Sequence, residues 1–189
     1  VRSLQLGFDY LSLHPLIGIA IPFLIELSNF TQETVCLTEP DDGEMVYIAR
    51  FVSARYIPIH MPTGSRIPMY CTGSGRAILS ALPEDEARGI LDRQPIRAHT
   101  VHTCTDVEAL MDVLRAARAR GYAFNKEELF LGDMTLAAPV LNGEGRPVAA
   151  VHVVVPTSRW ALREAEEKMA PALLACARSL TNAMRTVGD

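Results

Sequence analysis

Residues 134–156 read MTLAAPVLNGEGRPVAAVHVVVP and carry the clearest strand signal in the chain. Two runs rich in valine, leucine and alanine flank the sequence Asn-Gly-Glu-Gly at 142–145, a composition typical of a tight turn. The pattern therefore predicts two antiparallel strands joined as a hairpin. Because side chains alternate along a strand, the second run divides into two faces. One face is expected to carry Val148, Ala150, His152 and Val154, and the other Ala149, Val151, Val153 and Val155.

A histidine interrupts one of these otherwise apolar faces. Among such neighbours, His152 has the usual pattern of a hydrogen-bonded core residue. The alternative is a pocket residue that meets the polar end of a ligand. Asn125, which follows Tyr122 and Phe124, has two interpretations of the same kind: a turn residue at a strand end or a ligand contact. The residues alone leave both choices open.

Hairpins and helices alternate along the rest of the chain. A first hairpin is predicted within residues 31–51, with Asp41-Asp42-Gly43 as its turn, and the proline-containing residues 55–70 are expected to be extended. Helices are predicted for residues 3–28, 75–82, 83 onward, 105–120 and 160–184. This order predicts an α+β fold in which helices cover a central antiparallel sheet.

Local signals refine the ends and interiors of these helices. Thr105-Asp-Val-Glu108 has the form of a capping box, and Gly121 is expected to end the helix that follows it. Pro22 and Pro171 lie inside predicted helices. Because an interior proline removes a backbone hydrogen bond and clashes with the preceding turn, a kink or a break is expected at each.

The bulk composition is that of one ordinary globular domain. The chain has 189 residues, of which 49% are hydrophobic, and its net charge is −4. A surface that binds nucleic acid is normally basic, so the composition does not indicate one. No apolar run reaches the length of a membrane span, and no signal peptide is recognisable, so no membrane partner is expected.

The four cysteines, Cys36, Cys71, Cys104 and Cys176, lie far apart in the sequence. No CxxC pair and no His-Glu-x-x-His motif occurs, so neither a metal site nor a cofactor is expected. Isolated cysteines fit a reducing compartment, and the expected location is the cytoplasm. Each is expected to be a small buried hydrophobic residue.

Residues 70–79 read YCTGSGRAIL and offer backbone groups rather than a catalytic motif. The sequence lacks the lysine and the spacing of a phosphate-binding P-loop. Four residues separate Cys71 from Arg76, one fewer than a cysteine phosphatase loop needs. Glycines at a helix start leave N–H groups unpaired, and the helix dipole favours an anion there, such as a small carboxylate. The other interpretation is a tight turn that only lets the helix pack on the sheet.

Four segments occur in an order that is similar to a known family. They are TQETVCLTEPDDGEMVYIARF (31–51), GSRIPMYCTGSGRAILSALP (64–83), RARGYAFNKEE (118–128) and AAPVLNGEGRPVAAVHVVVP (137–156). Together they resemble the effector-binding domain of IclR-type bacterial transcription regulators, and the resemblance covers nearly the whole chain. It implies a GAF-like (profilin-like) fold, a central antiparallel sheet flanked by helices, with a pocket for a small organic acid. It also implies a ligand sensor and not an enzyme.

The resemblance further implies a domain organisation. LQLGFDYL (4–11) is similar to the linker helix that follows the winged helix-turn-helix domain of the family. Residues 1–28 are therefore expected to be linker and N-terminal helices, and residues 29–189 the GAF-like effector-binding domain. The DNA-binding domain is expected to be absent from this chain, so DNA is a partner only through that domain. The resemblance implies a homodimer or tetramer whose effector alters DNA binding or transcription.

The ligand contacts implied by the resemblance transfer position by position. Where some relatives have an aspartate and two serines, this chain has Asn125, His152 and Val154, which favours a larger ligand than glyoxylate, with an apolar body. Residues 30–51 and 64–80 are most similar to the branch of the family that responds to aromatic acids such as protocatechuate and 4-hydroxybenzoate. That resemblance implies an aromatic acid as the ligand, with Arg50, Arg55 and His60 supplying charge near the mouth. The expected contacts are Gly73, Ser74, Asn125, Thr135, His152 and Val154, with Tyr56, Ile59, Ile67 and Met134 as apolar walls.

Two other functions compete with this interpretation. The first is a GAF-fold enzyme that uses Cys71 as a nucleophile, which needs a second cysteine or a general base nearby. The second is a pure oligomerisation module, which predicts no pocket and no ligand.

Overall fold

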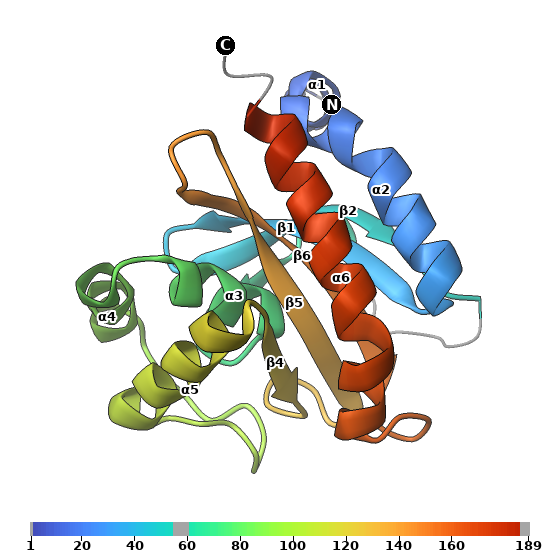
Figure 1. The fold of residues 1–189 in the computed structure, drawn as a ribbon. Coiled ribbons are helices and arrows are strands. Elements are labelled where there is room, and N and C mark those ends of the chain that lie inside the picture. Colours follow the sequence, from blue (N-terminus) through green and yellow to red (C-terminus); the bar gives the residue numbers. More distant parts are fainter. Residues whose placement is uncertain (1, 55–60, 186–189) are drawn as a thin grey trace.

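The computed structural model describes residues 2–54 and 61–185, in which six strands form one antiparallel sheet of order β3-β2-β1-β6-β5-β4 (Figure 1). The strands are β1 (Thr34–Asp41), β2 (Glu44–Phe51), β3 (Arg66–Pro68), β4 (Ala123–Lys126), β5 (Asp133–Leu141) and β6 (Pro147–Pro156). The helices are α1 (Arg2–Leu13), α2 (Pro15–Thr31), α3 (Gly73–Ala81), α4 (Glu84–Arg93), α5 (Val107–Arg120) and α6 (Leu162–Arg185). The expected α+β fold and both expected hairpins, β1–β2 and β5–β6, are confirmed.

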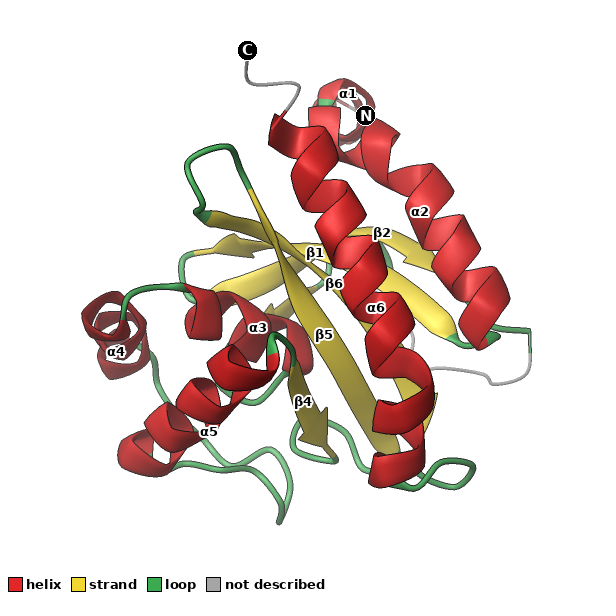
Figure 2. Cartoon of the chain, viewed as in Figure 1, coloured by secondary structure: helices red, strands yellow, loops and turns green. Residues whose placement is uncertain are grey.

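The two faces of the sheet pack into separate apolar cores. Figure 2 shows helices on both sides of the sheet. Helices α2 and α6 lie side by side across one face, where Val151 and Val153 of β6 are fully buried. Helices α3, α4 and α5 cover the other face, where Ala150 and Val154 of the same strand lie. The alternation predicted for this strand is therefore confirmed, and His152 belongs to the face that carries α3.

Side-chain caps place two helix starts differently from the sequence patterns. Helix α3 begins at Gly73, two residues before the expected start, because the Thr72 hydroxyl accepts a hydrogen bond from Gly75 N at 3.3 Å. The expected capping box at 105–108 is wrong by one residue, since the cap of α5 is Asp106, whose carboxylate accepts from Ala109 N at 2.8 Å. Gly121 ends α5 with φ of 80°, as predicted.

The prolines inside the helices do not end them. Helix α2 continues through Pro22 and α6 through Pro171, so of the kink or break expected at each proline, the break is excluded. The helical structure expected over residues 3–28 is confirmed, and it is divided at His14, where the backbone is extended between α1 and α2. Pro15 starts α2, a position where the missing N–H costs no intrahelical hydrogen bond.

Candidate functional site

Strand pairing brings residues from five strands, most of them polar, onto the α3 side of the sheet. In one row across the sheet, Cys36 of β1 pairs with Arg50 of β2 and with His152 of β6. In the next row, Thr135 of β5 pairs with Val154 and with Asn125 of β4. Residues two positions apart along a strand share a face, so these rows form one continuous polar area.

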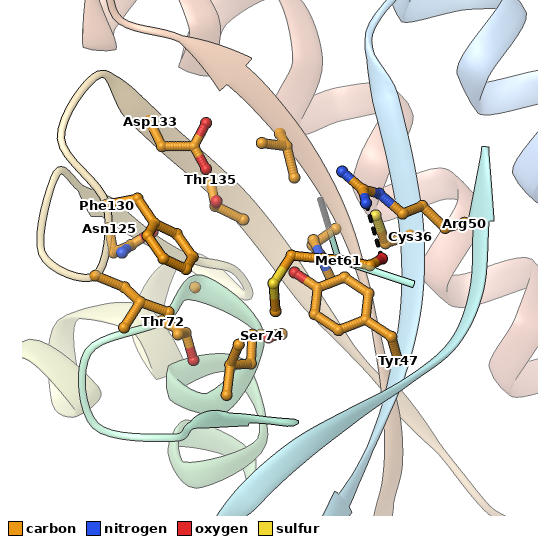
Figure 3. Close-up of a pocket in the computed structure, with 15 residues that line it drawn as sticks. Cys36, Tyr47, Arg50, Met61, Thr72, Ser74, Asn125, Phe130, Asp133 and Thr135 are labelled. Atoms are coloured by element: carbon orange, nitrogen blue, oxygen red, sulfur yellow. Dashed lines mark hydrogen bonds between the residues drawn. The ribbon is translucent and has the colours of Figure 1, made fainter. Parts of the chain in front are cut away.

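This area is the floor of a small cavity that the start of α3 borders (Figure 3). The cavity volume is about 40 Å³, which is room for only a few water molecules. Met61 and Phe130 are partly exposed and lie across the space. The lining residues are Cys36, Tyr47, Arg50, Met61, Ile67, Thr72, Gly73, Ser74, Asn125, Leu129, Phe130, Asp133, Thr135, His152 and Val154.

The start of α3 supplies the donors of the cavity. Thr72 accepts hydrogen bonds from Gly75 N through its hydroxyl and from Arg76 N through its carbonyl. The amides of Gly73 and Ser74 precede these bonds and lie at the positive end of the helix dipole. Asn125 donates from Nδ2 to Cys71 O at 2.9 Å, which fixes its amide beside the same helix start. An uncharged amide at this position is compatible with a carboxylate bound to α3.

His152 and Tyr47 form an edge-to-face pair, with ring centroids 5.5 Å apart and an interplanar angle of 78°. Burial, together with the charge of Arg50, lowers the pKa of His152 to about 3, so the imidazole is neutral near pH 7. Its Nδ1 atom is buried and has no hydrogen-bond partner within the described residues. Burial also raises the pKa of Tyr47 above its usual range, and Figure 3 shows its ring entering the pocket from β2. Both rings can therefore exchange neutral hydrogen bonds with a ligand.

Arg50 and Asp133 bring charge to the cavity from β2 and β5 (Figure 3). Arg50 donates from Nη1 to Met61 O at 2.8 Å, which ties the segment that carries Met61 to β2. Burial raises the pKa of Asp133 to about 6, and the positive charge of Arg50 opposes that rise. A carboxyl group that titrates near pH 6 makes the charge of the cavity depend on pH.

Replacing Asp133 with asparagine is expected to remove a pH-dependent loss of stability. A carboxyl whose pKa is raised on folding, from 3.8 to about 6, stabilises the fold fully below pH 4, and this contribution is lost as the pH rises through 6. The Asp133→Asn variant should therefore have a higher melting temperature than the unaltered chain at pH 8 and nearly the same one at pH 4. Melting curves from pH 4 to pH 8 check this. Equal differences at both ends would contradict the raised pKa.

The structure brings together seven of the ten residues expected to contact a ligand. Gly73, Ser74, Asn125, Thr135, His152, Ile67 and Val154 line the cavity. Met134 does not. Its side chain is fully buried in the opposite core, below α2 and α6, because it is adjacent to Thr135 on β5 and adjacent residues of a strand face opposite ways. The expectation for Met134 is therefore wrong. Tyr56 and Ile59, together with Arg55 and His60, lie outside the described residues.

Eight lining residues were not among the expected contacts, although Arg50 was expected near the mouth. Strand register is the signal that finds Cys36, which lies between Arg50 and His152 in its row. Tyr47 reaches the cavity through a bulge in β1–β2 pairing that no local pattern marks. The others, besides Arg50, are Met61, Thr72, Leu129, Phe130 and Asp133.

Cys71 has none of the properties of a nucleophile. It is fully buried, and burial raises the pKa of its thiol to about 12. It does not line the cavity, and its carbonyl serves only to hold Asn125. All four cysteines are free, and within residues 2–54 and 61–185 no three His, Cys, Asp or Glu side chains are grouped as metal ligands. In that same part of the chain, every helix is too short or too polar to cross a membrane.

Comparisons with known proteins agree on one family. The family described as the bacterial transcriptional regulator IclR C-terminal domain matches residues 8–182. The Pca regulon regulatory protein of Pseudomonas putida is 33% identical over 180 residues, which are 95% of this chain and 62% of that protein. The crystal structure of Thermotoga maritima IclR superposes with a TM-score of 0.91 at 28% identity, covering 97% of this chain and 74% of that one.

A solved inducer-binding domain is similar over its whole length. This domain belongs to PobR from Acinetobacter and was solved as a double mutant in complex with 3-hydroxybenzoic acid. The TM-score is 0.80 at 29% identity, and the match covers 88% of this chain and 97% of that one.

The fold and the comparisons identify a domain of a transcription regulator. The chain belongs to the IclR family of bacterial transcriptional regulators, as its effector-binding C-terminal domain. It spans about 62% of the length of its Pseudomonas putida relative.

Proposed function

We propose that the cavity binds a small organic acid, most favourably a hydroxylated aromatic one, and that its occupancy sets the regulatory state of the full-length protein. The carboxylate binds the amides of Gly73 and Ser74 at the start of α3. The aromatic ring lies against Tyr47 and His152, and the ring hydroxyl meets the imidazole. The observation that carries the proposal is the buried Nδ1 of His152 in the cavity that α3 borders, which finds no hydrogen-bond partner in the part of the chain that the structure describes.

The energetic argument rests on unsatisfied polar groups. A buried polar atom without a partner costs about 1–3 kcal/mol, and a ligand that supplies the missing hydrogen bond recovers this energy. The cavity of about 40 Å³ is too small for an aromatic acid as it stands. Met61 is partly exposed and lies across it, so we infer that binding requires this side chain to move. The 3-hydroxybenzoic acid bound to the PobR domain supports the aromatic class.

The regulatory half of the proposal lies outside this chain. We infer that, in the full-length protein, residues 1–28 follow a winged helix-turn-helix domain and link it to residues 29–189. Residues 29–189 are proposed to sense the effector. Because binding free energies are reciprocal, an effector that changes operator affinity must itself bind differently when DNA is bound. The full-length protein is proposed to act as a homodimer or tetramer in the cytoplasm.

A thermal-shift panel tests the ligand class. The compounds are glyoxylate, pyruvate, succinate, benzoate, 3- and 4-hydroxybenzoate, protocatechuate, and the methyl ester of 4-hydroxybenzoate. A ligand at 100 times its Kd adds about 2.7 kcal/mol, which in a chain of this size raises the melting temperature by roughly 5–10 °C. We expect this shift for the hydroxylated aromatic acids and not for the ester, which lacks the anion.

A matched variant separates the roles of the carboxylate and the hydroxyl. His152→Phe keeps a ring beside Tyr47 and removes both nitrogens. It is expected to bind benzoate as the unaltered chain does and to lose about fivefold in preference for 4-hydroxybenzoate over benzoate, one neutral hydrogen bond being worth about 1 kcal/mol. Shifts with short acids alone would overturn the aromatic class. No shift with any compound would favour the oligomerisation module.

A further inference from the structure

A short loop between β4 and β5 forms one wall of the cavity and is closed at its base by its own hydrogen bonds. Glu127 N donates to Asp133 O at 2.7 Å, and the Glu127 carboxylate accepts from Gly132 N at 2.9 Å. Glu127 and Gly132 both have positive φ, 58° and 82°, as the tight return of the chain requires. Leu129 and Phe130, between these two residues, line the cavity.

A buried ion pair joins this loop to α3. Arg76 is 3% exposed and donates to both carboxylate oxygens of Glu128, from Nη1 at 2.5 Å and from Nη2 at 2.7 Å. Its third donor, Nε, bonds Tyr70 O at 2.8 Å, so the guanidinium is held on two sides. Bidentate geometry of this kind fixes orientation as well as distance.

A second set of contacts holds the loop from the segment before α5. Cys104 N donates to the Glu128 carboxylate at 3.0 Å. The hydroxyls of Thr100 and Thr103 donate to the carbonyls of Glu127 and Glu128, each at 2.6 Å. Glu128 is therefore the point at which α3, the loop and the segment 100–104 meet.

Arg76 lies in the first turn of the helix whose start borders the cavity, two residues after Ser74. The same ion pair thus fixes the amide donors of α3 and the wall that faces them. We propose that the Arg76–Glu128 pair is the positioning element of this pocket, holding Leu129 and Phe130 as a fixed wall at the helix start. As a statement about effector binding this rests on the proposed function, whereas the closed wall can be measured without a ligand.

The cysteines of the chain provide a reporter for the wall. Cys36 lies in the cavity, and Cys176 lies in the core below α2, on the other face of the sheet. Burial raises the pKa of both thiols to about 12, so neither reacts readily while it stays buried. Opening the wall exposes Cys36 and not Cys176, whereas global unfolding exposes both.

The experiment measures methyl methanethiosulfonate labelling of each cysteine by peptide mass spectrometry. In Arg76→Met/Glu128→Leu, which removes the pair without leaving a single buried charge, we expect labelling of Cys36 to rise about tenfold or more and that of Cys176 to stay unchanged. Glu128→Gln, which keeps the shape but leaves the charge of Arg76 uncompensated, should also raise the labelling of Cys36. The control is Arg146→Met/Glu86→Leu, which removes an exposed bidentate pair with similar geometry away from the cavity. It should change neither rate.

The outcomes separate this inference from the proposed function. Unchanged labelling of Cys36 in both Arg76→Met/Glu128→Leu and Glu128→Gln would overturn the positioning role. A parallel rise at Cys36 and Cys176 would overturn it as well. In the unaltered chain, protection of Cys36 by 4-hydroxybenzoate supports effector binding in this cavity. If 4-hydroxybenzoate gives no protection but labelling of Cys36 rises selectively in the double variant, the positioning role of the ion pair is supported. That result would count only against the proposed effector.

Discussion

Replacing Gly75 with alanine is expected to lower the free energy of unfolding by about 3 kcal/mol, the upper end of the usual cost of overpacking. A Cβ atom at Gly75 would lie 2.2 Å from Met69 Cα and 2.3 Å from Met69 O. These are backbone atoms of the strand end that leads into α3, so no side-chain rotation relieves the clash. Urea denaturation checks the prediction through a lower midpoint at unchanged slope.

Two other glycines provide matched controls for Gly75→Ala. Gly89 lies in α4, where a Cβ would meet only the end of the Arg93 side chain at 3.4 Å, and alanine there is expected to stabilise by about 0.5–1 kcal/mol. At Gly73 a Cβ would lie 3.0 Å from Thr135 Cγ2, inside the cavity. Gly73→Ala should therefore weaken ligand binding more than stability. A Gly75→Ala variant as stable as Gly89→Ala would show that Met69 does not contact α3 as described.

Removing one partner of the buried Arg76–Glu128 pair is expected to cost about 3–5 kcal/mol, because the remaining charge stays buried without compensation. Both Arg76→Met and Glu128→Leu should show this loss. The double variant should recover most of it, since two apolar side chains of similar size replace the pair and no charge remains. Denaturation of the four proteins gives the interaction energy as a double-mutant cycle.

The exposed pair Arg146–Glu86 is the control for this cycle. It has the same bidentate geometry, with distances of 2.9 and 2.8 Å, and lies in solvent, where screening weakens it. Single substitutions there are expected to change stability far less than those at Arg76 or Glu128. Additive losses at Arg76 and Glu128, with no recovery in the double variant, would contradict the compensation that the structure describes.

Local patterns predicted the elements that depend only on neighbouring residues. The turns Asp41-Asp42-Gly43 and 142–145, the helix end at Gly121 and the two faces of β6 are set by backbone preferences and by a period of two. The helix starts that were predicted wrongly depend on particular hydrogen bonds. Asp106 rather than Thr105 caps α5, a choice between adjacent residues with nearly equal preferences.

Part of the candidate site was also accessible from the sequence. The backbone donors at Gly73 and Ser74 follow from the TGSG sequence, and His152 follows from its place on an apolar face. The expectation for Met134 failed because it ignored the alternation of side chains along a strand. Met134 and Thr135 are adjacent, so they cannot both face one cavity. Asp133 and Phe130 had no local signal, because a strand end and a loop of this composition occur in many settings.

The sequence by itself determined the fold class, the hairpins and the family, because these follow from short-range periodicity and from ordered segments that are recognisable one at a time. Only the tertiary structure decided the cavity. The cavity depends on the paired rows of strand residues, on the neutral imidazole of His152 and on the Arg76–Glu128 ion pair. The two residues of that ion pair lie 52 positions apart in the sequence. Burial and pairing depend on which strands become neighbours, and that is settled when the whole sheet packs between its two helical layers.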